Sequence, residues 1–113
     1  MRGRILFVIR VDPADERIAS EVLSELLTFA AFDVPVSVLV LDRAARLLSK
    51  EISPALSGMM ASLDLYGIKD IFVERESLEK VGNPLNSLPD GTTLLDQSEV
   101  ALFFRRYDSI YGS

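Results

Sequence analysis

The chain alternates nearly continuous apolar runs with segments in which apolar residues are spaced more widely. Residues 4–11 are apolar almost throughout, and residues 36–41 repeat that character. Runs of this kind, rich in β-branched residues and bounded by charge, are typical of strands buried on both faces of a parallel sheet. Shorter apolar runs predict further strands at residues 71–73 and 92–95, and residues 109–111 predict a final edge strand.

Helical spacing follows the first strand. Asp12 has a side chain that can cap a helix, and Pro13 suits the first helical position, where its missing N–H has no partner to lose. Apolar residues then recur at spacings of four, which predicts a helix packed on the sheet. These residues are Ile18, Val22, Leu26 and Ala30.

The segments between the later strands also carry helix signals. Residues 43–50 predict a short helix, and a longer helix begins at Ser53 and Pro54 and stops at Gly67. Residues 77–81 predict a short helical turn before Gly82. The next segment, residues 83–91, is dense in turn-forming residues and predicts an exposed connection.

The last helix carries a cluster of aromatic residues. Asp96 and Glu99 have the spacing of a capping box and predict where this helix begins. Phe103, Phe104 and Tyr107 follow on one helical face. Two adjacent phenylalanines cannot both face one core directly, so one of them is expected at a rim or at a subunit interface.

Strands and helices that alternate along a chain of 113 residues predict one α/β domain over residues 1–113. The expected architecture is a three-layer α/β/α sandwich with a mostly parallel sheet of about five strands. Ligands of such sheets bind beyond the carboxyl ends of the strands. The residues that follow the first three strands, Asp12, Asp42 and Glu74, are therefore the candidates for a pocket.

The amino-acid composition excludes several kinds of catalytic and metal-binding site. The chain contains no cysteine and no histidine, which excludes thiol nucleophiles, zinc or iron sites with cysteine ligands, and serine–histidine triads. The positions of the six glycines allow neither a dinucleotide fingerprint nor a P-loop. We therefore expect no bound cofactor, no metal and no independent catalytic activity.

Charge and hydropathy narrow the range of partners. Seventeen acidic residues against twelve basic ones give a net charge of −5, and no block of like charges could follow a phosphate backbone. No apolar run is long enough to cross a bilayer, and the N-terminal segment turns polar too early for a secretory signal. We expect a cytoplasmic protein that binds neither nucleic acid directly nor membranes.

The segment from Tyr66 to Val73, with Ser77-Leu78 and Gly82 behind it, resembles the DsrE/DsrF-like sulfur-relay family, especially its DsrF and TusC branch. The order and spacing of shorter motifs extend this resemblance along nearly the whole chain. These motifs are Arg4 to Val8, Val38 to Asp42, Leu47-Leu48 and Tyr107-Asp108. The resemblance implies a complex of related small α/β subunits, often a hetero-hexamer, that passes sulfane sulfur towards tRNA thiolation or sulfur oxidation.

In the sulfur-carrying subunits of that family, a cysteine lies just after the strand that corresponds to Ile71 to Val73. Glu74 stands at or within a residue of that place here. A carboxylate cannot carry a persulfide, because the transfer needs a nucleophilic thiolate. The resemblance therefore implies a non-catalytic subunit that forms a homo-oligomer, or a hetero-oligomer with related DsrE-like subunits. The residues expected at its interface are Tyr66, Phe72, Phe103, Phe104 and Tyr107.

Two alternatives stay open at this point. Asp12, Asp42 and Glu74 could gather at the carboxyl edge of the sheet to bind a small molecule or a metal through their oxygens. The chain could also form a homo-oligomer of the same fold that has no role in sulfur chemistry.

Overall fold

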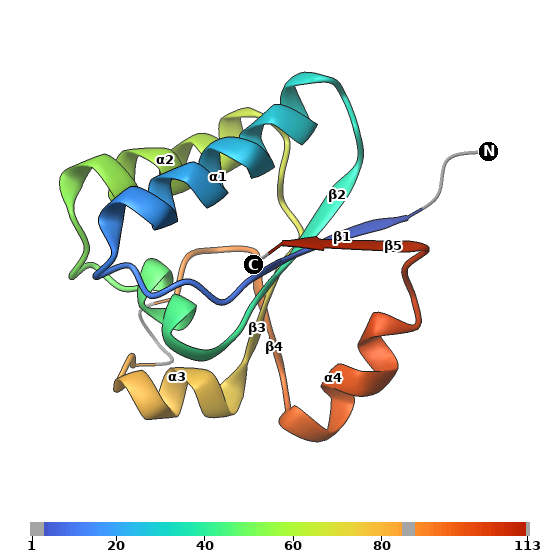
Figure 1. Ribbon diagram of the computed structural model, residues 1–113. Coiled ribbons are helices and arrows are strands. Elements are labelled where there is room, and N and C mark those ends of the chain that lie inside the picture. The colour runs from blue at the N-terminus through green and yellow to red at the C-terminus, as the bar shows by residue number, and fades with distance from the viewer. Residues whose placement is uncertain (1–3, 85–87, 113) are drawn as a thin grey trace.

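Five strands form one sheet in the computed structural model, which describes residues 4–84 and 88–112 (Figure 1). The strand order is β4-β3-β2-β1-β5, and each neighbouring pair is parallel. The chain steps outward from β1 to β4 and then crosses back to place β5 beside β1. The strands are β1 (Ile5–Ile9), β2 (Val36–Val40), β3 (Ile71–Glu74), β4 (Thr92–Leu95) and β5 (Ser109–Gly112).

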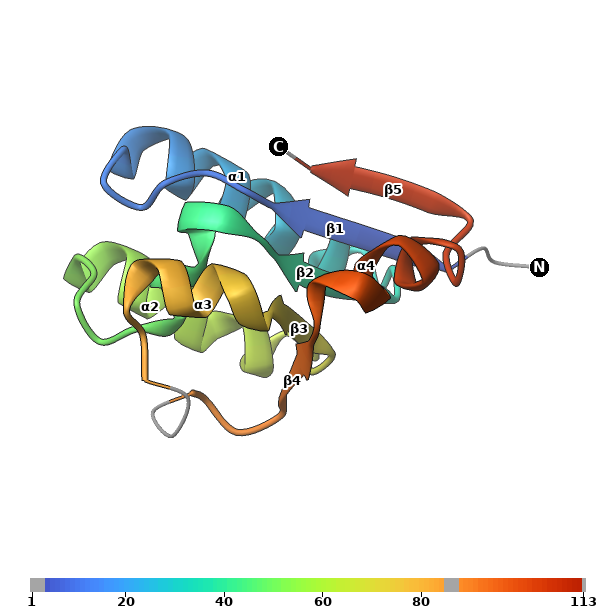
Figure 2. The same cartoon turned by 90° about the horizontal axis from the view of Figure 1, so that it is seen from below.

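The helices lie on both faces of this sheet, so the predicted three-layer α/β/α architecture is confirmed. Figure 2 shows α4 on the near side of the sheet and α1 and α2 on the far side. A short 3₁₀ helix, η1, packs against α3. The helical elements are α1 (Glu16–Ala31), η1 (Asp42–Leu48), α2 (Pro54–Leu65), α3 (Arg75–Val81) and α4 (Gln97–Phe104).

Alternation along the central strand explains why both faces are covered. Side chains of a strand point alternately to the two faces. In β1, Phe7 and Ile9 join the core under α1 and α2, whereas Leu6 and Val8 join the core under α4. All four are buried. The continuous apolar run at residues 4–11 therefore reflects a strand with a core on each side.

The beginning of α1 differs from the prediction. The helix starts at Glu16 with Asp15 as its N-cap, whose carboxylate accepts the Ile18 N–H at 3.4 Å. Asp12 and Pro13 form a turn ahead of the helix, in which the Asp12 side chain accepts the Ala14 N–H at 2.9 Å. Asp12 and Asp15 both have side chains that can cap a helix, and the cap is Asp15, which is nearer to the apolar residues of the helix.

The helix α4 begins as predicted and ends earlier than expected. Asp96 and Glu99 form the capping box, and the helix stops at Phe104, so Tyr107 lies beyond its end. Phe103 is only 2% exposed, whereas Phe104 is partly buried at the rim. The two adjacent phenylalanines therefore divide between core and rim, as their spacing required.

Two connections also differ from expectation. The predicted turn at residues 77–81 is a longer helix that starts at Arg75 and ends at Gly82, whose φ of 70° suits a residue without a side chain. Asn83 was expected to be exposed but is buried, with its side-chain amide donating to the Ala45 carbonyl at 3.4 Å. Residues 85–87 of the predicted exposed connection lie outside the described residues.

The final strand is the edge strand predicted for residues 109–111, extended by one residue. Arg4, just before β1, holds the start of β5: its N–H donates to Asp108 Oδ2 at 2.6 Å, and its carbonyl accepts the Ser109 N–H at 3.2 Å. At the other end, a Cβ placed on Gly112 would overlap the Val8 carbonyl group. Glycine thus allows β5 to lie against β1 along its whole length.

Candidate functional site

The carboxyl ends of β1, β2 and β3 meet at one edge of the sheet. Asp12 follows β1, Asp42 begins η1 one residue beyond the end of β2, and Glu74 ends β3. Because these three strands are adjacent and parallel, the residues behind them share the edge at which ligands of α/β sheets bind. This edge is the candidate functional site.

Each aspartate at this edge is engaged by an arginine. Asp12 lies 3.5 Å from Arg43, and Asp42 lies 3.8 Å from Arg10. Both arginines and Asp42 are largely exposed and Asp12 is partly exposed, which limits the contribution of these pairs to stability. The part of the chain that the structure describes contains no group of three or more acidic, histidine or cysteine side chains that could hold a metal ion. The three acids thus do not gather in the way that the metal-binding alternative requires.

Glu74 is bound into a hydrogen-bonded chain instead. The Ser77 hydroxyl donates to Glu74 Oε1 at 2.6 Å and accepts the Asp42 N–H at 2.8 Å. Ser77 is 1% exposed, so the hydroxyl that joins these two residues is shielded from water. Asp42 has a φ of 56°, in the left-handed region that few residues other than glycine adopt. We name these three residues the Glu74–Ser77–Asp42 clasp.

The clasp joins the two turns that leave β2 and β3. A hydrogen bond to an ionised acceptor is stronger than one between neutral groups, so the Glu74 carboxylate orients the Ser77 hydroxyl towards itself. The hydroxyl oxygen is then free to accept from the Asp42 backbone, which keeps the left-handed turn in place. Glu74 can accept hydrogen bonds and present negative charge, but it has no sulfur atom with which to receive a sulfane group.

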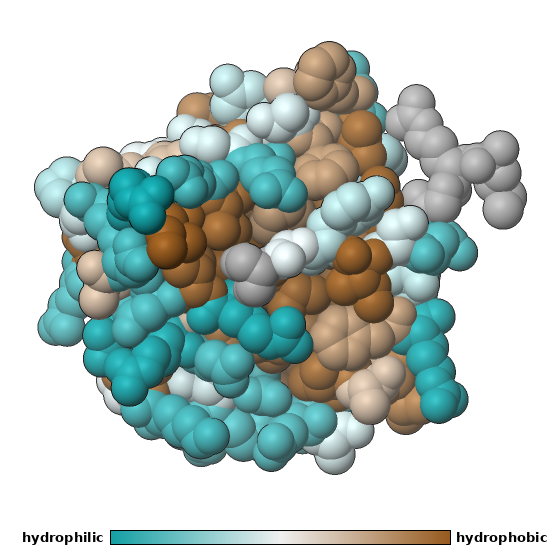
Figure 3. All heavy atoms as spheres, viewed as in Figure 1, coloured by the Kyte–Doolittle hydropathy of each residue, from teal (hydrophilic) through white to brown (hydrophobic). Residues whose placement is uncertain are grey.

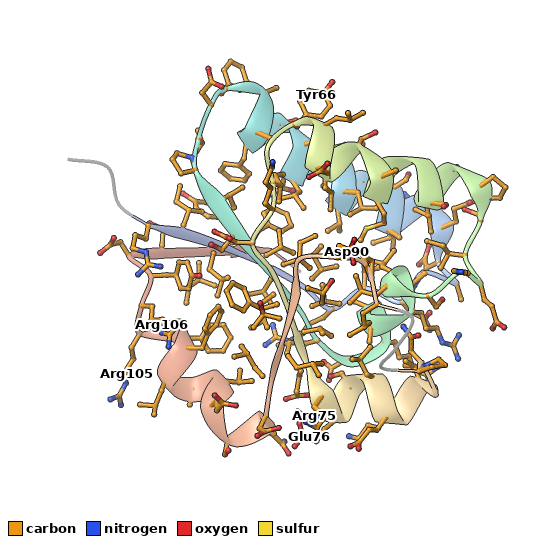
Figure 4. All side chains as sticks on the ribbon, turned by 180° about the vertical axis from the view of Figure 1, so that it is seen from behind. Tyr66, Arg75, Glu76, Asp90, Arg105 and Arg106 are labelled. Carbon is orange, nitrogen blue, oxygen red and sulfur yellow. The ribbon has the colours of Figure 1, made fainter. Side chains whose placement is uncertain are left out.

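A second polar link joins α3 to the beginning of α4 (Figure 4). Arg75 Nε donates to Asp96 Oδ1 at 2.8 Å, and the Gln97 N–H donates to Glu76 Oε1 at 2.9 Å. The hydrogen bond to Asp96, together with the charge of that carboxylate, raises the pKa of Arg75 above its ordinary value. Sequence reasoning missed this link, because it joins residues 21 positions apart that only the parallel β3–β4 pair brings together.

The residues predicted at an interface fall into two separate places. Phe72, Phe103, Phe104 and Tyr107 belong to the core under α4, where the rings of Phe72 and Phe103 are 4.6 Å apart and those of Phe103 and Tyr107 are 5.2 Å apart. Tyr66 is exposed at the end of α2, on the other side of the sheet (Figure 4). The five residues predicted at an interface therefore do not share one surface, and Phe103 is buried within the chain.

A cleft of about 640 Å³ lies away from the carboxyl-edge acids, between η1, α2 and residues 89–91. Its wall is largely apolar and includes Met60, Ile68 and Ile71, with Lys50 and Lys69 also in the lining. No sequence motif marked this cleft. Its lining comes from segments far apart in the sequence, which a linear pattern does not bring together.

Among the described residues, no helix is sufficiently long and apolar to span a membrane.

Comparisons with known proteins agree with the fold and the resemblance. No family model matches the chain. A curated protein from Pseudomonas aeruginosa, named Protein TusC homolog, is 29% identical to it over 97% of this chain and 98% of its own length.

Solved structures support the architecture alone, because their sequence identity is low. The ychN protein from E. coli superposes with a TM-score of 0.73 at 12% identity and covers 99% of this chain and 100% of its own. A protein of unknown function from Methanobacterium thermoautotrophicum, MTH1491, gives a TM-score of 0.68 at 21% identity over 93% of this chain and 91% of its own. The full-length similarity to a TusC homolog confirms the chain's predicted resemblance to the DsrE/DsrF-like family on its DsrF and TusC side, and the solved structures agree with the predicted fold.

Proposed function

We propose that this chain is a non-catalytic subunit of a TusC-like sulfur relay that assembles with related α/β subunits, one of which carries the reactive cysteine. The support for membership in such a system is the similarity to a TusC homolog over 97% of the chain. The support for a non-catalytic role is the absence of cysteine from the sequence.

The observation that carries this proposal is the place and engagement of Glu74. It ends β3, where the family resemblance puts the cysteine of a sulfur-carrying subunit, and its carboxylate is held by Ser77. In sulfur transfer, a cysteine thiolate attacks the outer sulfur of a donor persulfide, the S–S bond of the donor breaks, and the donor leaves as a thiol. Glu74 cannot perform that attack, so the thiolate has to come from another subunit.

The same geometry suggests what the chain contributes. The Glu74–Ser77–Asp42 clasp fixes the turns at the carboxyl edge, which gives a partner a surface of constant shape and charge. A fixed surface costs less conformational entropy on binding than a mobile one. The chain thus completes or orients a site whose chemistry lies on its partner.

The alternative of a small-molecule site formed by the three acids has less support. Asp12 and Asp42 lie near arginines, and Glu74 accepts the Ser77 hydroxyl, so each carboxylate has a partner within the chain. A ligand at this edge would have to displace those contacts.

The test uses the purified chain together with a relative from the same genome that has a cysteine after its third strand. Native mass spectrometry measures assembly, and intact-mass analysis after treatment with a persulfide of a small thiol measures sulfur loading. We expect a complex, loading of the relative alone, and faster onward transfer from the relative when this chain is present.

A matched variant defines the role of the carboxylate. Glu74→Gln keeps an oxygen that can accept from Ser77 and removes the charge, so we expect the complex to form and the unfolding midpoint to change little. Sulfur loading of this chain, or transfer by the relative at the same rate with and without it, would contradict the proposal.

A further inference from the structure

The edge strand β5 is exposed along its whole length. Ile110 is 51% exposed and Tyr111 is 45% exposed, and both are large apolar side chains in a strand of four residues. Among the described strands, β5 pairs only with β1. Natural edge strands usually carry a lysine, a proline or an inward-pointing charge that prevents pairing with another chain. The sequence Ser-Ile-Tyr-Gly has none of these.

The backbone of β5 presents hydrogen-bonding groups outward. The Ser109 N–H donates to the Arg4 carbonyl, so the polar groups of Ser109 face β1. Successive residues of a strand direct their N–H and C=O groups to opposite sides. The N–H and C=O of Ile110 therefore point away from β1, and those of Gly112 do the same. A further strand could accept and donate at these two positions.

A largely apolar hollow flanks the strand on the α1 face of the sheet, and a smaller hollow of mixed polarity flanks it on the α4 face. On the α1 side, Tyr111 lines a hollow of about 440 Å³ with Phe29, Phe32 and Val34. On the α4 side, Ile110 lines a hollow of about 270 Å³ with Phe104, and Arg10 also belongs to its wall. Figure 3 shows apolar residues gathered beside β5 and over α4, in contrast to the hydrophilic surface over α3.

An exposed apolar side chain widens this surface beyond the strand on the α1 side. Phe32, which follows α1 and shares the hollow with Tyr111, is 76% exposed. An exposed apolar surface on both sides of an unprotected edge is typical of a protein–protein contact.

We propose that a second copy of this chain docks here by adding its own β5, antiparallel, to form one continuous sheet across two subunits. This inference rests on the proposed function, because it names one of the surfaces by which the assembling subunit makes its complex. The carboxyl edge with Glu74 lies at the end of β3, which β2 and β1 separate from β5. A cysteine-bearing relative can therefore bind at that edge while the second copy occupies β5.

Charge and symmetry argue for a second copy as the occupant. An uncharged strand can lie against itself without bringing like charges together, whereas like charges directly opposite destabilise a strand pair. Two antiparallel strands related by a two-fold axis normal to the sheet keep equivalent faces together. With the axis at Ile110, the outward N–H and C=O of each Ile110 meet those of the other copy, and each Ile110 side chain lies on the α4 face.

The test measures the mass of the purified wild-type chain in solution by sedimentation equilibrium, together with two variants. We expect a dimer for the wild type. Ile110→Lys places a like-charged pair at the centre of the contact, and we expect its dimer dissociation constant to rise by about tenfold or more. Leu65→Lys is the matched control, because Leu65 is 84% exposed at the end of α2 and the charge change is the same. It should stay dimeric.

A backbone variant tests the strand pairing itself. Ile110→Pro removes the outward N–H and leaves the hydrogen bonds of Ser109 and Tyr111 to β1, so we expect a folded chain, checked by circular dichroism, with weakened association. A monomeric wild type overturns this inference, and so does a dimer that Ile110→Lys leaves intact. Neither result affects the sulfur-relay proposal, which fails if the cysteine-bearing relative does not bind or does not respond, or if this chain itself is loaded with sulfur.

Discussion

The two faces of the sheet are covered by very different means. On one face, α1 of 16 residues and α2 of 12 residues pack many aliphatic side chains against the strands. On the other face, α4 has 8 residues and relies on aromatic rings centred on Phe103. Each aromatic side chain buries about 150–250 Å². A short helix can therefore close a face if rings replace the missing turns, but that face then depends on few residues.

We expect the largest loss of stability on the aliphatic face, the face of the sheet that α1 and α2 cover. Phe7→Ala removes a fully buried ring that contacts Phe29 at a centroid distance of 5.9 Å. Because this core lies between the sheet and two long helices, the cavity collapses little, and we expect the free energy of unfolding to fall by about 5 kcal/mol. Urea denaturation measures this loss. A loss near 1 kcal/mol would show that this face repacks freely.

Phe103→Ala makes the matching change on the aromatic face. The ring is equally enclosed, but a helix of two turns can settle towards the sheet, so we expect a loss of about 3 kcal/mol, at the low end for this substitution. Leu65→Ala is the control for both variants, because a side chain that is 84% exposed should change stability by less than about 0.5 kcal/mol. If Phe103→Ala lowers the free energy of unfolding more than Phe7→Ala does, the aromatic face is the more sensitive of the two.

The smallest of these effects is expected at the carboxyl edge, outside both apolar cores. Ser77→Ala removes the hydroxyl between Glu74 and Asp42 and leaves the Asp42 N–H without that acceptor. We expect a loss of about 1–2 kcal/mol in urea denaturation, the cost of breaking a shielded hydrogen bond. Ser77→Thr keeps the hydroxyl and serves as the control. An unchanged stability for Ser77→Ala would mean that the clasp does not hold the edge together.

Much of the architecture was predictable from the sequence, because its signals are local. The apolar runs of β1 and β2 and the capping box of Asp96 and Glu99 are encoded within a few residues. The predicted beginning of α1 was wrong, because the sequence pattern alone does not distinguish Asp12 from Asp15 as the helix cap. Strand order was not predictable, since it depends on which helix covers which face.

The candidate site was predictable in place but not in detail. The apolar run of residues 71–73 placed Glu74 directly after the third strand, and the structure has it as the last residue of that strand. Its bond to Ser77 and the contact of Ser77 with the Asp42 backbone depend on how two turns approach each other. The separation of Tyr66 from the α4 aromatics likewise follows from topology, because the sheet lies between α2 and α4. No residue pattern within either segment encodes that separation.

The contact between Arg4 and Asp108 has a consequence for the order in which the molecule folds. These residues are 104 positions apart, so the pairing of β5 with β1 closes almost the full length of the chain. Bringing such distant segments together costs more loop-closure entropy than any of the stepwise pairings from β1 to β4. We expect β5 to join the sheet last and to leave it first, as its amide hydrogen exchange would show. The strand proposed to bind a second copy is then also the part of each subunit that this binding stabilises most.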